Sequence, residues 1–281
     1  NESATGYEFA DYEDADISGA IYSDLNNDGS LNGAETGIAA GYGATPHVRL
    51  TGTDYAGNAV DVTAVTASGA YTFADIAPSD ATGYVVTQLE EPSGFLDGLE
   101  ENGTGNTLAG TVDGIEQIDV GVLNPGDVLG NRNFGQVAES SLAGIVYLDD
   151  NADGARQGGE TGTFDGATIE LSGTDDLGRT ISCSFVSAAG GAFSFPVAAC
   201  PEIRPGSYTL SLTNAPGRVP SGTSAGSAGG TTATTAISAI NVTAGTTGTD
   251  YLFGLRQSDI IANDNDFTSV PLNGANGGDT A

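Results

Sequence analysis

The sequence predicts an all-β protein made of two tandem immunoglobulin-like β-sandwiches, and three observations support this fold class. Glycine is abundant, with 43 of 281 residues, and Thr, Ser and Val are frequent, which favours strands and turns over long helices. Stretches such as 167–173 and 207–213 place apolar residues at every second position, as strands with one buried face do. The chain also repeats its motifs after roughly 120 residues, a distance typical of whole domains.

Four motifs recur in the same order in the two copies. They are "SDLNNDGSLNGAETG" and "LDDNADGARQGGETG", "LTGTDYAGN" and "LSGTDDLGR", "SGAYTF" and "GGAFSF", and "NRNFGQ" and "DYLFGL". We therefore expect a first module at 16–136, a short and stiff linker at 137–140 and a second module at 141–255.

Each module is expected to contain seven short strands separated by turn-forming residues. In the first module they lie near 17–22, 47–52, 60–65, 70–74, 83–90, 116–121 and 131–135. In the second module they lie near 142–147, 167–172, 180–186, 192–196, 207–213, 237–242 and 250–254. Seven strands in about 100–120 residues are typical of a two-sheet sandwich. The acidic stretch 94–111 and the low-complexity stretch 219–236 are expected to be long surface loops.

The charge of the chain limits its partners. There are 37 acidic residues against 7 basic ones, all of them arginine, so the net charge is −30. Such a charge argues against nucleic acids and anionic membranes as partners. It favours divalent cations, or a high-salt medium that screens the repulsion. No apolar run approaches the roughly 18 residues that a membrane span needs. The chain begins at Asn1 and is expected to be a mature or excised segment.

The two cysteines, Cys183 and Cys200, are expected to form a disulfide, because no further metal ligands lie near them in the sequence. This bond would place the chain in an oxidising compartment. Two buried free thiols are the alternative.

Residues 24–35 and 149–160 have the spacing of a twelve-residue calcium loop, with a glycine at position 6 and a glutamate at position 12. The expected ligands of the first loop are Asp24, Asn26, Asp28, the Ser30 carbonyl, Asn32 and Glu35. Those of the second loop are Asp149, Asn151, Asp153, the Ala155 carbonyl, Gln157 and Glu160. No helix flanks either segment, so a strand would have to frame each loop. A solvated acidic turn without an ion is the alternative.

These motifs, together with "SGAYTFADIAP" and "EPSGFLDGLE", resemble the B domains of serine–aspartate-repeat surface adhesins, within the broader class of collagen-adhesin B-type modules. The resemblance covers about 16–136 and 141–255. It implies prealbumin-like sandwiches strung in tandem on a bacterial surface, with calcium bound in the loop after the first strand. Many such modules are locked by a Lys–Asn isopeptide bond, which this lysine-free chain cannot form, so calcium and the disulfide would have to supply rigidity.

We therefore expect an extracellular structural repeat rather than an enzyme: part of a calcium-stiffened filament or adhesin stalk whose partners are other copies or adjacent modules. A calcium-dependent module that binds a host carbohydrate or protein is the alternative, although the chain lacks Trp for stacking on sugars. His47, the only histidine, lies in a short insertion and is expected to be an ordinary strand-edge residue.

The two ends of the chain fit neither module. Within 1–15, Tyr7 and Phe9 match Tyr251 and Phe253 of the last strand of the second module. Residues 6–12 are expected to pair as a β-strand with a neighbouring module, in the same long chain or in the next subunit, and so to build a filament. Cut linkers or disorder at both ends are the alternative. Residues 256–281 are expected to be a polar linker or tail.

Overall fold

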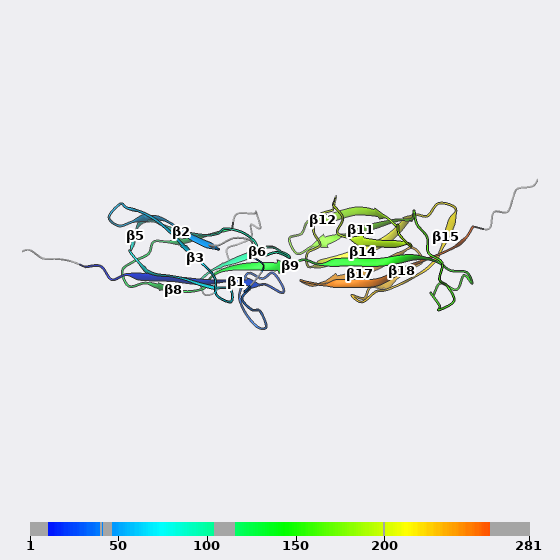
Figure 1. The fold of residues 1–281 in the computed structure, drawn as a ribbon, viewed down its shortest axis with the longest axis horizontal. Coiled ribbons are helices and arrows are strands. Elements are labelled where there is room, and N and C mark those ends of the chain that lie inside the picture. Colours follow the sequence, from blue (N-terminus) through cyan, green and yellow to red (C-terminus); the bar gives the residue numbers. More distant parts are fainter. Residues whose placement is uncertain (1–10, 40, 42–46, 104–115, 199, 259–281) are drawn as a thin grey trace, which may run out of the picture.

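The structure is a computed structural model that describes residues 11–39, 41, 47–103, 116–198 and 200–258. The described residues form two β-sandwiches that lie end to end along one axis (Figure 1). The predicted all-β fold is therefore confirmed. No helix in the described part of the chain is long and apolar enough to cross a membrane.

The first sandwich contains nine strands. They are β1 (Ala15–Ser23), β2 (Val48–Asp54), β3 (Ala59–Ala64), β4 (Ala70–Ile76), β5 (Ser79–Gln88), β6 (Phe95–Asn102), β7 (Gln117–Gly121), β8 (Val128–Leu129) and β9 (Arg132–Ala138). One sheet has the order β4-β1-β9-β6, with β8 paired to β1, and it faces a sheet of order β3-β2-β5-β7.

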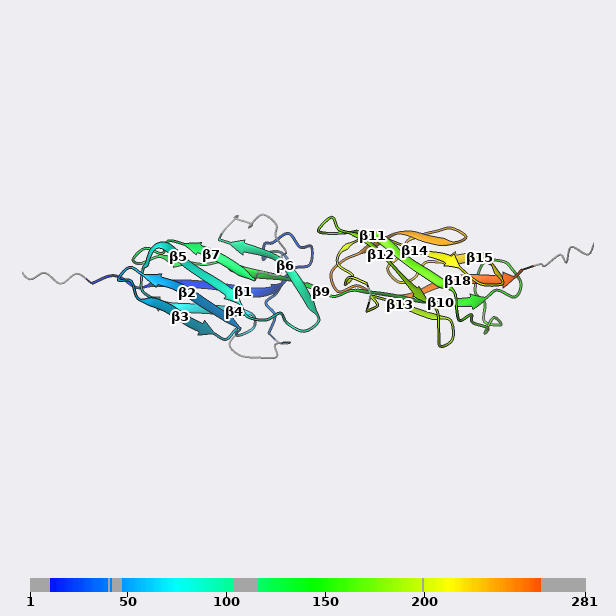
Figure 2. The same ribbon diagram turned by 90° about the horizontal axis from the view of Figure 1, so that it is seen from above.

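The second sandwich repeats this arrangement. Its strands are β10 (Ser141–Leu148), β11 (Thr168–Asp175), β12 (Thr180–Val186), β13 (Ala192–Phe195), β14 (Gly206–Asn214), β15 (Arg218–Ser224), β16 (Thr231–Thr232), β17 (Ala236–Val242) and β18 (Thr247–Gln257). The sheet β13-β10-β18-β15 faces the sheet β12-β11-β14-β17, to which β16 is added (Figure 2). The repeated motifs therefore fold into one repeated topology.

Alternation along the strands builds a separate core in each sandwich. In β2, Val48 and Leu50 are buried while Arg49 between them is exposed. Tyr208 and Leu210 of β14 are buried in the same way. Successive side chains of a strand point to opposite faces, so each strand contributes one row to the core. Burying one large apolar side chain contributes roughly 1.5–3 kcal/mol.

The first and last strands of each sandwich are neighbours and run parallel. In the first sandwich β1 pairs with β9, and Ile21 lies opposite Phe134. In the second, β10 pairs with β18, and Val146 lies opposite Phe253. The repeated first-strand and last-strand motifs therefore form the centre of the same sheet in each sandwich.

The expectation of long surface loops at 94–111 and 219–236 is wrong for much of both stretches. They contain β6 and most of β15, so seven strands in each sandwich were too few. Both strands lie at the edge of a sheet, where β6 pairs with β9 and β15 pairs with β18. An edge strand needs ladder hydrogen bonds on one side only, and β15 therefore tolerates Pro220 and Gly222, which hide its pattern. Residues 104–111 lie outside the described part of the chain.

The connection between the sandwiches is short and hydrogen-bonded on both sides. Glu139 and Ser140 alone separate β9 from β10. The N–H of Glu139 donates to the carbonyl of Gly94 in the first sandwich, at 3.0 Å. The hydroxyl of Ser140 donates to the carbonyl of Thr243 in the second, at 3.1 Å. Both residues of the connection are therefore held in place.

Candidate calcium loops and the module junction

The first predicted calcium loop, residues 24–35, starts where β1 ends. Asp24 directly follows β1, and its exposed fraction is 0%. One carboxylate oxygen of Asp24 accepts the N–H of Gly29 at 2.9 Å, and the other accepts the N–H groups of Asn26 and Asp28 at 3.2 and 3.3 Å. Gly29 has a φ of 71°, which favours glycine. The carboxylate of Asp24 therefore organises the turn from its inner side.

The other predicted ligands form the outer half of this loop. Asn26 Nδ2 and Asn32 Nδ2 donate to Asp28 Oδ2 at 2.8 and 3.2 Å. The carbonyl oxygen of Ser30 accepts a second hydrogen bond from Asn32 Nδ2, at 3.0 Å. The carboxylate of Glu35 accepts the N–H of Asn32 at 2.9 Å and closes the loop. The structure therefore brings all six predicted residues into one hydrogen-bonded unit.

The second loop, residues 149–160, repeats these hydrogen bonds. Asp149 is 2% exposed and accepts the N–H of Gly154 at 2.8 Å. Gln157 Nε2 donates to Asp153 Oδ2 at 2.6 Å, and the N–H of Gln157 donates to Glu160 at 2.8 Å. The remaining predicted ligands, which donate to the Asp153 carboxylate, are Asn151 and Ala155. Two segments of partly different sequence thus adopt one loop structure.

A buried tyrosine of the preceding strand lies on the inner side of each loop. Tyr22 and Tyr147 are buried, and the Tyr22 hydroxyl donates to Asp24 at 3.4 Å. Burial and, to a smaller extent, the charges of the loop carboxylates raise the pKa of both phenols, to about 12 for Tyr147, so both hydroxyls stay protonated. A Cβ added to Gly135 or Gly254 would lie 3.1 or 2.7 Å from the hydroxyl of the neighbouring tyrosine. This contact explains the glycine in the repeated "NFG" and "LFG" motifs.

The donor set of each loop fits a hard cation. Three carboxylates, with amide and carbonyl oxygens, are ligands that calcium takes in sets of roughly six to eight oxygens. Burial raises the pKa of Glu35; the N–H groups of Asn32 and Leu25 oppose this shift, and the charges of Asp24 and Asp28 add to it. Because the carboxylates repel one another, a bound cation would stabilise the loop.

One closer group of carboxylates lies outside both loops. Among the residues that the structure describes, Glu91, Asp97 and Glu116 have oxygens within 4.8 Å of one another. The carboxylates of the two predicted loops, all of which are described, do not form such a group. The sequence analysis did not single out these three acids, which come from three separate segments.

The first loop also takes part in the contact between the sandwiches. Asn27 accepts the N–H of Leu99 in β6 at 3.0 Å and donates to Asp176 of the second sandwich at 2.8 Å. Asp176 accepts two hydrogen bonds from Arg204, at 2.8 and 3.2 Å. Arg204 also donates to the carbonyl oxygen of Asp97 at 2.7 Å, and its side chain is 3% exposed. A buried arginine therefore joins the two sandwiches, and the sequence analysis missed it.

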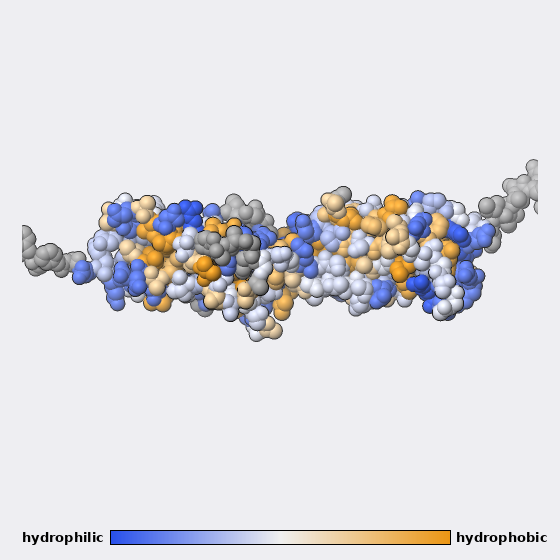
Figure 3. All heavy atoms as spheres, viewed as in Figure 1, coloured by the Kyte–Doolittle hydropathy of each residue, from blue (hydrophilic) through white to orange (hydrophobic). Residues whose placement is uncertain are grey.

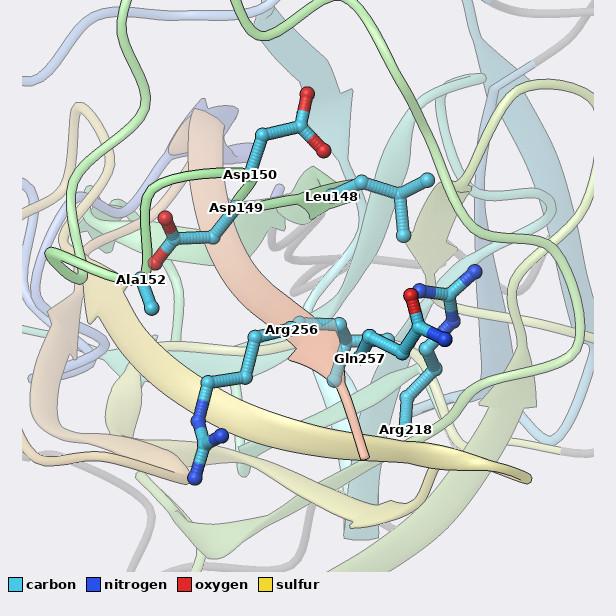
Figure 4. Close-up of a pocket in the computed structure, with 8 residues that line it drawn as sticks. Leu148, Asp149, Asp150, Ala152, Arg218, Arg256 and Gln257 are labelled. Atoms are coloured by element: carbon cyan, nitrogen blue, oxygen red, sulfur yellow. The ribbon is translucent and has the colours of Figure 1, made fainter. Parts of the chain in front are cut away.

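The far end of the second sandwich corresponds to the end of the first sandwich that contacts its neighbour. Figure 4 shows Asp149, Ala152, Arg218 and Arg256 around a cavity of about 300 Å³, with the Asp149 carboxylate directed toward Ala152. Ala152 stands at the loop position of Asn27, and the two residues share a positive φ of 59° and 54°. The backbone turn at this position is therefore repeated, although Ala152 lacks the side-chain amide with which Asn27 contacts the second sandwich.

The predicted disulfide is confirmed, because Cys183 in β12 is bonded to Cys200 with the Cα atoms 5.6 Å apart. His47 is buried just before β2, and its Nδ1 lies 2.8 Å from Thr66 Oγ1. This contact is structural, as expected of a residue at the edge of a strand.

The chain is similar in sequence to serine–aspartate-repeat proteins. It is 28% identical over 169 residues to serine-aspartate repeat-containing protein E of Staphylococcus aureus (strain Newman), which covers 57% of this chain and 13% of the relative. It is 28% identical over 171 residues to serine-aspartate repeat-containing protein F of Staphylococcus epidermidis, with 60% and 9% covered. The resemblance predicted from the sequence is confirmed, and the chain spans only a small part of these relatives. No protein-family model matches the chain.

Similarity to solved structures is weak. A streptococcal ancillary pilin gives a TM-score of 0.32 at 10% identity and covers 89% of this chain and 64% of the pilin. The shaft pilin SpaA from Lactobacillus rhamnosus GG gives a TM-score of 0.28 at 14% identity, with 89% and 100% covered. TM-scores this low support no argument about shared architecture, so the fold rests on the strands and sheets described above.

Proposed function

We propose that the chain is a structural repeat of an extracellular surface filament or adhesin stalk, stiffened by calcium and without enzymatic activity. The observation that carries this proposal is the position of the first loop at the junction. Asn27, in the middle of the loop, bonds both to Leu99 of its own sandwich and to Asp176 of the next. A cation that orders the loop would therefore also order the contact between modules. Similarity to serine–aspartate-repeat proteins supports a location on the cell surface.

In this filament, copies join end to end. Three of the seven arginines, Arg156, Arg218 and Arg256, lie in or beside the second loop. The opposite end begins with the exposed acids Asp11, Glu13 and Asp14. Hydrophilic residues are concentrated at both far ends (Figure 3). Ion pairs between these arginines and the acidic end of the next copy would favour head-to-tail contact, which does not close on itself and so builds filaments.

The proposed contact includes β-strand pairing by residues 1–12 with a neighbouring module. Residues 1–10 lie outside the described part of the chain. Tyr12 packs on Tyr55, with ring centroids 4.0 Å apart, at the end of the first sandwich far from the junction. Tyr55 stands at the position of Asp176 in the repeated "GTD" motif, so this end corresponds to the surface that Asn27 contacts.

Calorimetric titration of the full chain is expected to show calcium binding at both loops, with dissociation constants of about 10⁻⁴ M or tighter. Asp28→Ala combined with Asp153→Ala is expected to remove both loop sites, because each aspartate holds the neighbouring ligand side chains. Asp150→Ala is the matched control, since Asp150 occupies a non-ligand position and points away from Asp149 (Figure 4). If the double variant keeps as many sites as the parent, the loop assignment is wrong.

Deleting residues 1–12 is expected to leave both sandwiches folded and to abolish end-to-end association, because the donated strand is lost. Sedimentation and electron microscopy in the presence of calcium would measure association, and circular dichroism would confirm the fold. Filaments of the same repeat from the truncated chain would contradict strand donation.

A further inference from the structure

The junction end of the first sandwich has polar side chains where the rest of the sandwich has an apolar core. Gln88 in β5 and Gln136 in β9 each follow a core residue, Val86 and Phe134, by two positions. Because strand side chains alternate, both amides point inward between the two sheets. Gln88 is 3% exposed and Gln136 is 0% exposed. Two buried amides therefore close this end of the core.

Three carboxylates reach the same place. Oxygens of Glu91, Asp97 and Glu116 lie within 4.8 Å of one another. Asp97 in β6 is directly opposite Gln136 in β9, and opposed residues of an antiparallel pair share a face of the sheet. Glu116, just before β7, is tied to β5 because its carbonyl accepts the N–H of Gln88 at 2.8 Å. Both sheets thus contribute to one polar group.

The two buried amides of this group have atoms without hydrogen-bond partners. In the described part of the chain, neither the amide oxygen nor the amide nitrogen of Gln136 has a hydrogen-bond partner, and the same holds for the amide oxygen of Gln88. Buried polar atoms are almost always paired. Burial, and then the hydrogen bond to the Asp97 carboxyl and its charge, raise the pKa of Glu116.

We propose that this group binds a third divalent cation, of the calcium class. Its ligands are the three carboxylates and the amide oxygen of Gln136. Calcium takes carboxylate, amide and water oxygens together, which is the donor set found here. Glu91 is exposed and borders a cavity of about 400 Å³ that is also lined by Gln88 and Glu116, so an ion can reach the group from solvent.

This third cation does not depend on the two loops. Gly135, the neighbour of Gln136, faces Asp24 of the first loop, so the two candidate sites lie on opposite faces of β9. The third cation would act on the junction directly, because the carbonyl oxygen of Asp97 accepts the hydrogen bond from Arg204. A cation bound at this site would fix β6, the strand on which the second sandwich docks.

The test is a calorimetric titration with calcium of the full chain that carries Asp28→Ala and Asp153→Ala. One site is expected to remain, and adding Glu116→Gln is expected to remove it. Glu139→Gln is the matched control, because Glu139 is exposed and lies in the nearby linker. With chelator present, Glu116→Gln is expected to leave the melting temperature nearly unchanged, because glutamine has almost the same shape as glutamate.

Glu91→Gln provides a second variant at an exposed ligand that is not needed for folding, and it is expected to weaken the remaining site by about tenfold. Loss of all calcium binding in the loop variant would overturn the third site while supporting the loop sites. A third site that survives Glu116→Gln would also overturn it. If the loop variant instead keeps as many calcium sites as the parent chain, the proposed loop sites are wrong.

Discussion

Replacing Arg204 with alanine is expected to destabilise the second sandwich by about 3 kcal/mol and to loosen the junction. The Arg204 side chain is 3% exposed and that of its partner Asp176 is 11% exposed. Without the arginine, Asp176 keeps a mostly buried charge. The hydrogen bond that it accepts from Asn27 of the first sandwich remains. Breaking such a pair costs more than the pair contributes, because the remaining charge stays desolvated. Calorimetry is expected to show a fall of roughly 10 °C in the melting temperature of the second sandwich.

The same substitution also removes the hydrogen bond to the Asp97 carbonyl, which joins the two sandwiches. Small-angle scattering in calcium is therefore expected to show a broader distribution of particle lengths than the parent. Arg49→Ala is the control, because the Arg49–Asp61 pair lies on the surface with both side chains about half exposed, and little change is expected. Unchanged scattering and melting in the Arg204 variant would show that the arginine does not hold the junction.

Reduction of the disulfide is expected to destabilise the second sandwich alone, by about 3 kcal/mol, because the bond closes a loop whose ends are 17 residues apart. Cys183 lies in β12 at the edge of its sheet, and Cys200 lies in the segment that leads from β13 to β14. The bond therefore ties an edge strand to the chain that crosses the end of the sandwich. Calorimetry with and without reductant would measure the shift.

The first sandwich contains no cysteine and is the internal control, since its transition is expected to stay in place. The variant Cys183→Ala/Cys200→Ala is expected to melt at the lower temperature whether or not reductant is present. If reductant moves the melting of this variant too, or moves neither transition of the parent, the assigned effect of the bond is wrong.

The features that were predicted from the sequence have local signals. The strand β14 shows its alternation within seven residues, and each calcium loop is a single segment of twelve. By contrast, β6 and β15 were missed because edge strands tolerate glycine, proline and acidic residues. Their partners, β9 and β18, lie about thirty residues further along the chain. No local pattern could show this pairing. The calcium ligands themselves stay a prediction.

The junction could not be predicted in this way. Arg204 and Asp97 are 107 residues apart in the sequence, and Asn27 and Asp176 are 149 apart. Their contacts depend on how two folded sandwiches meet, which no strand or turn pattern encodes. One weak signal was present: Arg204 is one of only seven cations in a strongly acidic chain, and a buried carboxylate is a suitable partner for it.

The parallel pairing of the first and last strands decides how the chain would respond to pulling. Because β1 and β9 run in the same direction, the chain enters each sandwich at one end and leaves it at the other (Figure 1). Tension between the ends would slide β10 along β18, and the paired positions from Ser141 with Thr247 to Leu148 with Leu255 would resist together. Strands pulled apart from one end lose their hydrogen bonds singly, whereas strands pulled in shear must lose them as a group. A force applied to the two ends of a sandwich would therefore be borne by a single central pair of strands.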